Sequence, residues 1–164
     1  MPRIAVEDTV GDWLTLNPAL GAGLGALSNA VYNHSGLPMR ILEAARMRIA
    51  IANDCLTCRN ARQSRGKEFG VDEAFYDNIR EWRTSAGYSH RERMAIEYAE
   101  RFSLNHMGLV DDEDFWLRMH QYYNDADIVS LATCCSLWLG AGRTARVLDV
   151  GQACQLMLDS VTPY

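Results

Sequence analysis

The chain contains few prolines and a long stretch without any. Its four prolines stand at positions 2, 18, 38 and 163, so residues 39–162 contain none. Proline is excluded from helix interiors because it lacks a backbone N–H group and clashes with the preceding turn. Strand-like alternation of polar and apolar residues is also absent, so the sequence predicts an all-α fold.

The sequence also lacks a segment able to cross a bilayer and a cluster of basic residues. No run is long and uncharged enough to span a membrane, and Met1–Trp13 carries Glu7, Asp8 and Asp12 without the continuous apolar segment of a signal peptide. With a net charge of −5 and no Lys/Arg block, the chain is not expected to bind nucleic acid or an anionic membrane. We therefore expect a cytoplasmic protein.

Length and cysteine content narrow the class of protein further. The 164 residues, 48% of them hydrophobic, suffice for one core but not for two domains of ordinary size, so we expect one helical domain over residues 1–164. The five cysteines are an odd number and two of them are adjacent, which fits a secreted disulfide framework poorly. A reducing compartment with one special cysteine pair fits better.

Start and stop signals divide the chain into helices. Asn17-Pro18 and Asn124 are typical helix starts, and Ser89 begins a capping-box pattern. We expect Asp54 to cap a cysteine-bearing helix that Gly70 ends. The expected helices cover residues 18–33, 39–53, 55–69, 72–82, 90–104, one from 111 onward, 125–138 and, after an interruption at the glycines 140 and 142, 143–158.

The most informative motif is Cys55-Leu56-Thr57-Cys58, placed at the start of a predicted helix. Free backbone N–H groups and the positive end of the helix dipole favour a thiolate there, so redox chemistry is the leading hypothesis. A structural zinc site would need four ligands, and the sequence has no second Cys-x-x-Cys motif or His pair. We therefore expect neither a metal nor a bound cofactor. Two small residues packed at a helix start are the simpler alternative.

Two charged residues are candidates for neighbours of these thiols. If residues 39–53 and 55–69 form an antiparallel helix pair, Glu43 and Arg62 lie about 15 Å and about 12 Å from the hinge and can face each other. Arg62 follows Cys58 by four residues and would share its helix face. Such a cluster of charges shifts thiol pKa values.

Each candidate also has a structural explanation. Glu43 could instead form a surface ion pair with Arg46 or Arg48, and Arg62 could belong to a solvated face shared with its neighbouring arginines. Cys134 and Cys135 lie in the apolar run 128–139 and are expected in the core or at a subunit interface. The remaining cysteine and the histidines are isolated in sequence: Cys154, His34, His90, His106 and His120.

The stretch from Glu43 to Cys58, EAARMRIAIANDCLTC, resembles the core signature of the AhpD-like alkylhydroperoxidase and carboxymuconolactone decarboxylase family. Residues 91–100 and 128–138 are also similar, so the resemblance covers about residues 18–150. It implies an AhpD-like helical bundle that assembles as a dimer, trimer or hexamer. It also implies a peroxidase cycle in which Cys58 attacks the peroxide, Cys55 resolves the product to a disulfide and Glu43 is the relay carboxylate.

One position departs from the family pattern. Peroxidase members usually have histidine four residues after the second cysteine, where this chain has Arg62. Arginine can hold Cys58 as a thiolate through its fixed charge, but it cannot accept and return a proton. The resemblance then implies a thiol-dependent oxidoreductase that reduces a small hydroperoxide and is itself reduced by a dithiol partner of the lipoyl or thioredoxin type. The alternatives are a helical assembly or binding protein and a lactone decarboxylase, whose branch of the family generally lacks the cysteine pair.

Overall fold

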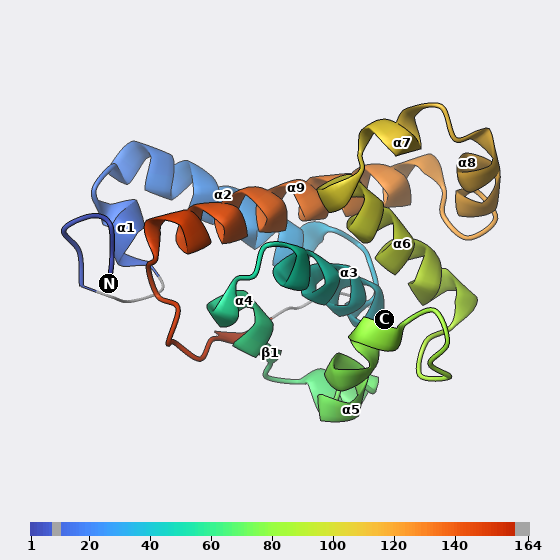
Figure 1. Ribbon diagram of the computed structural model, residues 1–164, viewed down its shortest axis with the longest axis horizontal. Coiled ribbons are helices and arrows are strands. Elements are labelled where there is room, and N and C mark those ends of the chain that lie inside the picture. Colours follow the sequence, from blue (N-terminus) through green and yellow to red (C-terminus); the bar gives the residue numbers. More distant parts are fainter. Residues whose placement is uncertain (8–10, 160–164) are drawn as a thin grey trace.

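The computed structural model describes residues 1–7 and 11–159, and it confirms the predicted all-α fold. Figure 1 shows the long helix α9 running along the molecule beside α2, with α1 near one end and α7 and α8 at the other. The helices are α1 (Asp12–Thr15), α2 (Pro18–His34), α3 (Met39–Ala52), α4 (Leu56–Asn60), α5 (Glu73–Asp77), α6 (His90–Leu104), α7 (Met107–Val110), α8 (Glu113–Met119) and α9 (Asp125–Leu148). None of the described helices has both the length and the apolar character needed to cross a membrane.

Helix α3 lies at the centre of the fold and packs against α6 and α9. It is buried on almost every side, and its buried residues include the charged pair Glu43 and Arg46. One apolar cluster joins α3 to α2, α6, α8 and α9, and a second joins it to α5, α6 and the 3-10 helix Asn78–Glu81. Because α3 has core on both sides, any charge that it carries inward must be paired within the protein.

The structure confirms the helix starts that were predicted from local capping signals. Asn17 accepts a hydrogen bond from the backbone of Leu20 at the start of α2, next to Pro18. Ser89 and Asn124 each form a complete capping box, at the starts of α6 and α9. These contacts satisfy N–H groups that have no partner within their own helix.

The predicted cysteine-bearing helix over residues 55–69 is wrong, because α4 ends at Asn60. After an extended Ala61, the chain forms strand β1 (Arg62–Gln63), which pairs in parallel with strand β2 (Met157–Leu158). A 3-10 helix, Gly66–Phe69, follows and ends at the left-handed Gly70. The backbone N–H of Arg62 donates to the carbonyl of Leu156 at 2.9 Å, and this bond to a distant segment ends the helix.

Three further boundaries differ from the sequence prediction. Cys55 occupies the N-cap of α4 in place of Asp54, which has a positive φ of 50° in the turn from α3. Asp112 caps α8, and the expected start at Asp111 instead follows the short α7. The glycines 140 and 142 do not interrupt α9, which continues to Leu148 before a left-handed Asp149. The expected helix over residues 143–158 therefore stops ten residues early.

Candidate active site

Cys55 and Cys58 are joined by a disulfide bond at the start of α4. The sharp turn after α3 places Cys55 at the N-cap, where its Sγ accepts a hydrogen bond from the Cys58 N–H at 3.3 Å. Cys55 is completely buried, whereas Cys58 is partly exposed. Cys58 is therefore the more accessible sulfur of the pair.

The segment that follows α9 holds the start of α4 in place. The Thr57 hydroxyl donates to the carbonyl of Gly151, and the Leu56 N–H donates to the side-chain oxygen of Gln152 at 3.1 Å. Further along, β2 pairs with β1 just beyond the end of α4. Residues about ninety positions apart in sequence thus fix the geometry of the cysteine motif.

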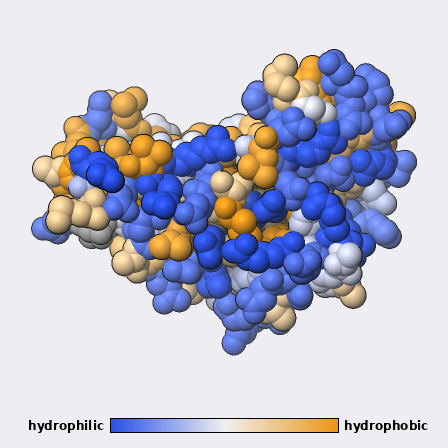
Figure 2. Space-filling model, viewed as in Figure 1, coloured by the Kyte–Doolittle hydropathy of each residue, from blue (hydrophilic) through white to orange (hydrophobic). Residues whose placement is uncertain are grey.

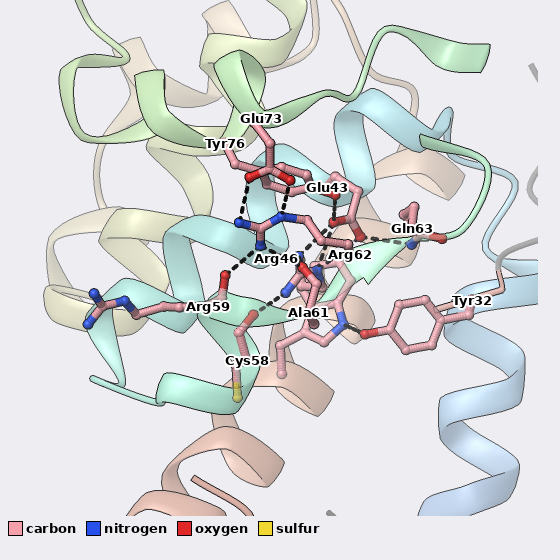
Figure 3. Close-up of polar contacts among 11 residues, drawn as sticks. Tyr32, Glu43, Arg46, Cys58, Arg59, Ala61, Arg62, Gln63, Glu73 and Tyr76 are labelled. Carbon is pink, nitrogen blue, oxygen red and sulfur yellow. Dashed lines mark hydrogen bonds and ion pairs between the residues drawn. The ribbon is translucent and has the colours of Figure 1, made fainter. Parts of the chain in front are cut away.

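A buried ion pair lies behind the cysteine motif (Figure 3). The Arg46 guanidinium contacts the Glu43 carboxylate through Nε at 2.9 and 3.0 Å and through Nη2 at 2.7 Å, and the two side chains are 4% and 0% exposed. Arg46 also donates to the carbonyl oxygens of Cys58, at 2.5 Å, and Ala61, at 3.1 Å. Arg46 therefore links the central helix to both ends of the last turn of α4.

The remaining positions on the Glu43 carboxylate are filled by neutral donors. Gln63 Nε2 donates to Oε1 and the Tyr76 hydroxyl donates to Oε2, each at 2.8 Å. Burial and the Glu43 charge raise the pKa of Tyr76, so this hydroxyl keeps its proton. Burial disfavours the charge on Arg46, but Glu43 outweighs it and the net effect is a raised pKa. The Glu43 carboxyl group is thus saturated with hydrogen bonds, and no hydrogen bond among the described residues joins it to a cysteine sulfur.

Arg62 does not lie on the same helix face as Cys58, because it belongs to β1. Its guanidinium forms two hydrogen bonds with Glu73, at 2.8 and 2.9 Å, and lies over the ring of Tyr76. In Figure 3 the sulfur of Cys58 points away from this group. The cation that contacts Cys58, through its backbone, is Arg46, the residue that the sequence suggested as a surface partner of Glu43.

An apolar cavity of about 290 Å³ lies against the disulfide. Both cysteines line it, together with residues from α1, α2, α9 and the segment after α9. Its polar lining groups are Ser28, Tyr32, Arg46 and Thr57. None of the four histidines lines this cavity, and all four are exposed. Sequence reasoning did not find Tyr32, because α2 carries no motif that points to the cysteines.

Helix α9 approaches the cysteine motif closely at Gly142. A Cβ atom on Gly142 would lie 2.6 Å from Asn53 Nδ2 and 3.4 Å from Cys58 Sγ. Asn53, at the end of α3, donates to the carbonyls of Trp138 and Leu139 and accepts from Arg143 at 2.9 Å. A side chain on residue 142 would therefore disturb the contact between α9 and α3.

Two of the other three cysteines lie in the core. Cys134 and Cys135 are buried in the core, as predicted from the apolar run that contains them. Burial raises the pKa of Cys134 to about 12 and also raises that of Cys135, so both remain protonated thiols at neutral pH. Cys154 is partly exposed. Within residues 1–7 and 11–159, no cluster of three or more His, Cys, Asp or Glu side chains is arranged to hold a metal ion.

The helical bundle with a Cys-x-x-Cys motif at a helix start has the AhpD-like fold. A model of the carboxymuconolactone decarboxylase family matches residues 18–101, just over half of the chain. The chain belongs to this family, which confirms the resemblance seen in the sequence. None of the curated proteins compared with the chain matches it.

Solved structures share this fold at low sequence identity. An Agrobacterium tumefaciens protein, described as of unknown function and as a candidate antioxidant defence protein AhpD, has a TM-score of 0.74 and 20% identity, over 91% of this chain and 96% of its own. The apo debrominase Bmp8 has a TM-score of 0.66 and 19% identity, over 84% and 73%. A variant of Bmp8 in complex with 2,3,4-tribromopyrrole has a TM-score of 0.68 and 18% identity, over 87% and 75%.

Proposed function

We propose that the protein is a thiol-dependent oxidoreductase that reduces an organic hydroperoxide through a Cys55–Cys58 dithiol/disulfide cycle. The observation that carries this proposal is the disulfide in the wall of an apolar cavity. A purely structural disulfide needs no such cavity, whereas a reactive one needs space for the molecule that it reduces. The two thiols supply both electrons, so the cycle needs no further cofactor.

The proposed cycle begins with the reduced pair. The Cys58 thiolate attacks the terminal peroxide oxygen, an S–O bond forms as the O–O bond breaks, and the leaving alkoxide takes up a proton to give an alcohol. Cys55 then attacks the sulfur of the Cys58 sulfenic acid, which forms the disulfide and releases water. The greater accessibility of Cys58 supports this order. A lipoyl or thioredoxin-like dithiol partner regenerates the thiols by thiol–disulfide exchange.

Glu43 contributes to this cycle through Arg46. Its carboxylate holds the guanidinium that binds the carbonyls of Cys58 and Ala61, and so it fixes the turn that carries the reacting sulfur. The role first expected for Glu43, relay of a proton, would require a path to Cys58 past Arg46, which is effectively never deprotonated. Arg62 fixes α5 against β1 through Glu73.

The test is peroxidase activity with defined reductants. The purified protein should consume cumene hydroperoxide with a lipoyl or thioredoxin-type reductant, and Cys58→Ser should abolish turnover. Treating the reduced protein with one equivalent of peroxide should lower its intact mass by about 2 Da, confined to the Cys55–Cys58 peptide. Peroxide consumption that survives Cys58→Ser would refute the assignment. A helical assembly or binding protein without turnover, the rival function, would show no mass loss.

The debrominase of the same fold supplies a second candidate reaction. Replacing bromine by hydrogen on a bromopyrrole also takes two electrons, which the same dithiol can supply as it becomes a disulfide, with release of bromide. Bromide release from 2,3,4-tribromopyrrole by the reduced protein, measured beside peroxide consumption, distinguishes the two substrates. A lactone decarboxylase, by contrast, would work without oxidation of Cys55 and Cys58.

We further propose that the protein is a homo-oligomer, as a dimer, trimer or hexamer. Three leucines around α2 lie on the surface: Leu16 is 60%, Leu20 is 70% and Leu27 is 36% exposed. Figure 2 shows apolar side chains gathered at the end of the molecule formed by α1 and α2. Exposed apolar patches are normally covered by partners. Light scattering that gives a monomer at every concentration would contradict this proposal.

A further inference from the structure

The cavity beside the disulfide selects against charged ligands. Arg46 is its only charged lining residue among the described residues, and that guanidinium is already paired with Glu43 and with two carbonyl oxygens. An ion moved from water into such a cavity would lose its hydration without gaining a counter-charge. The cavity therefore suits a neutral ligand with a mainly apolar body.

The polar groups on the cavity wall differ in what they have left to offer. The Thr57 hydroxyl proton is used on the carbonyl of Gly151. The Tyr32 hydroxyl accepts a hydrogen bond from the indole Nε1–H of Trp138 at 3.0 Å, and among the described residues it donates to none. A tyrosine hydroxyl has one proton to donate, so this donor remains available. Burial is the main cause that raises the pKa of Tyr32 to about 12, so the proton stays in place at neutral pH.

The position of Tyr32 is fixed from two sides. Its ring packs against Trp138, with centroids 6.4 Å apart, and the indole N–H orients its oxygen. Tyr32 and Trp138 come from α2 and α9, which pack together, and both line the cavity with the cysteines. A donor held in this way needs little reorganisation to bind a ligand, and pre-organisation of that kind increases affinity.

We propose that the Tyr32 hydroxyl, held by Trp138, binds and orients the oxygen end of a neutral, mainly apolar substrate in this cavity. The inference rests on the proposed function, in which that oxygen belongs to the hydroperoxide that Cys58 attacks. Donation from Tyr32 would also stabilise the negative charge that develops on the leaving oxygen as the O–O bond breaks. Tyr32 thereby determines which substrates are recognised.

Binding to the oxidised protein tests this inference without any turnover. The probes are 2-phenylpropan-2-ol, which carries a hydroxyl, and tert-butylbenzene, which has nearly the same shape and no oxygen. Trp13 and Trp138 line the cavity, so tryptophan fluorescence can report the binding of both. Tyr32→Phe should weaken binding of the alcohol about threefold to tenfold, the range expected for one neutral hydrogen bond, and should leave tert-butylbenzene binding unchanged.

Ser28→Ala is the matched control, because Ser28 lies on the same face of α2 and places a second hydroxyl on the cavity wall. Because Trp138 orients the Tyr32 hydroxyl, Ser28→Ala should weaken alcohol binding less than Tyr32→Phe does and should leave tert-butylbenzene binding unchanged. An equal loss of affinity for both probes in Tyr32→Phe would mean that Tyr32 acts by packing alone and would overturn the proposal. Loss of alcohol binding in Ser28→Ala with none in Tyr32→Phe would also overturn it, as would failure of both probes to bind the parent protein.

The binding test and the peroxidase test can fail independently. A protein that binds 2-phenylpropan-2-ol through Tyr32 but does not consume peroxide would refute the proposed reaction and retain the ligand site. If turnover is found, Tyr32→Phe should lower kcat/KM for both cumene hydroperoxide and hydrogen peroxide, because the lost donor contacts the peroxide oxygen that both substrates share. Unchanged kcat/KM for both peroxides would contradict a role of the Tyr32 hydroxyl in orienting the reacting oxygen.

Discussion

The Glu43–Arg46 pair offers the sharpest test of how the site is held together. Arg46→Met replaces the guanidinium by an apolar chain and leaves the Glu43 carboxylate, which is 0% exposed, with only two neutral donors. Removing one partner of a buried ion pair costs about 3–5 kcal/mol, because the remaining charge stays buried. The Cys58 carbonyl also loses the Arg46 donor, at about 1 kcal/mol or more, whereas the Ala61 carbonyl still accepts from Arg62 Nη1 at 3.0 Å. We therefore expect Arg46→Met to lower the free energy of unfolding by about 5 kcal/mol.

The double variant Glu43→Gln/Arg46→Met separates pairing from packing. It removes both charges, so it should be more stable than Arg46→Met alone. The losses of stability in Glu43→Gln and Arg46→Met, added together, should exceed the loss in the double variant by about 2 kcal/mol or more. Urea unfolding followed by circular dichroism at pH 7 measures each free energy. Comparable slopes against urea concentration are required, because a changed slope signals a changed denatured or native state.

Arg62→Met is the matched control for this experiment. It breaks the Arg62–Glu73 pair, in which Glu73 is 70% exposed, and exposed pairs contribute only about 0–1 kcal/mol. The expected result is a clearly larger loss of stability at the buried Arg46 than at Arg62, which is 23% exposed and paired with an exposed Glu73. Losses below about 1 kcal/mol for Arg46→Met, or additive effects of the two substitutions at the Glu43–Arg46 pair, would refute this reasoning.

Three further predictions concern the thiols, the departure from the family pattern and pH. In a Cys55→Ser background, the rate of Cys58 alkylation against pH should give a midpoint below the ordinary thiol pKa of about 8.5, because the backbone N–H groups at the start of α4 favour the thiolate; a midpoint at or above that pKa would contradict this prediction. Arg62→Ala should keep peroxide turnover within about twofold of the parent, since its guanidinium is engaged on the surface, and a large loss would return Arg62 to the reacting centre. Burial disfavours the charge of Glu100, but its hydrogen-bond donors outweigh this and lower the pKa to about 2. The stability that ionised Glu100 contributes is present above about pH 4.5 and is lost as the pH falls toward 2. Glu100→Gln should therefore lower the free energy of unfolding by about 2 kcal/mol at pH 7 and by progressively less in acid, as measured by urea unfolding. A loss that does not depend on pH would exclude this role.

Local signals in the sequence were sufficient to predict most of the helix starts. Asn17, Ser89 and Asn124 each form contacts within three residues, so the information that sets these boundaries lies next to them. The burial of Cys134 and Cys135 likewise follows from the apolar run around them. These predictions were confirmed because the residues that interact are close together in the sequence.

The boundary of the cysteine helix could not be predicted in the same way. Arg62 leaves the helix because its N–H bonds to Leu156, which is far along the chain and gives no local signal at residue 62. The prediction that the glycines 140 and 142 interrupt α9 was wrong for a related reason. Gly142 lies where a Cβ would collide with Asn53, so its lack of a side chain serves helix packing and not helix termination.

The error in the cysteine-helix boundary changed the expected site. Extending the helix to residue 69 placed Arg62 beside Cys58 and made it the natural replacement for the family histidine. The early end of α4 instead turns the carbonyls of Cys58 and Ala61 toward α3, where Arg46 meets them. The Glu43–Arg46 spacing of three residues was visible in the sequence, but its burial was not, since only the packing of α3 between two clusters excludes water from it. The charge beside the cysteine motif is thus supplied from the helix that precedes it.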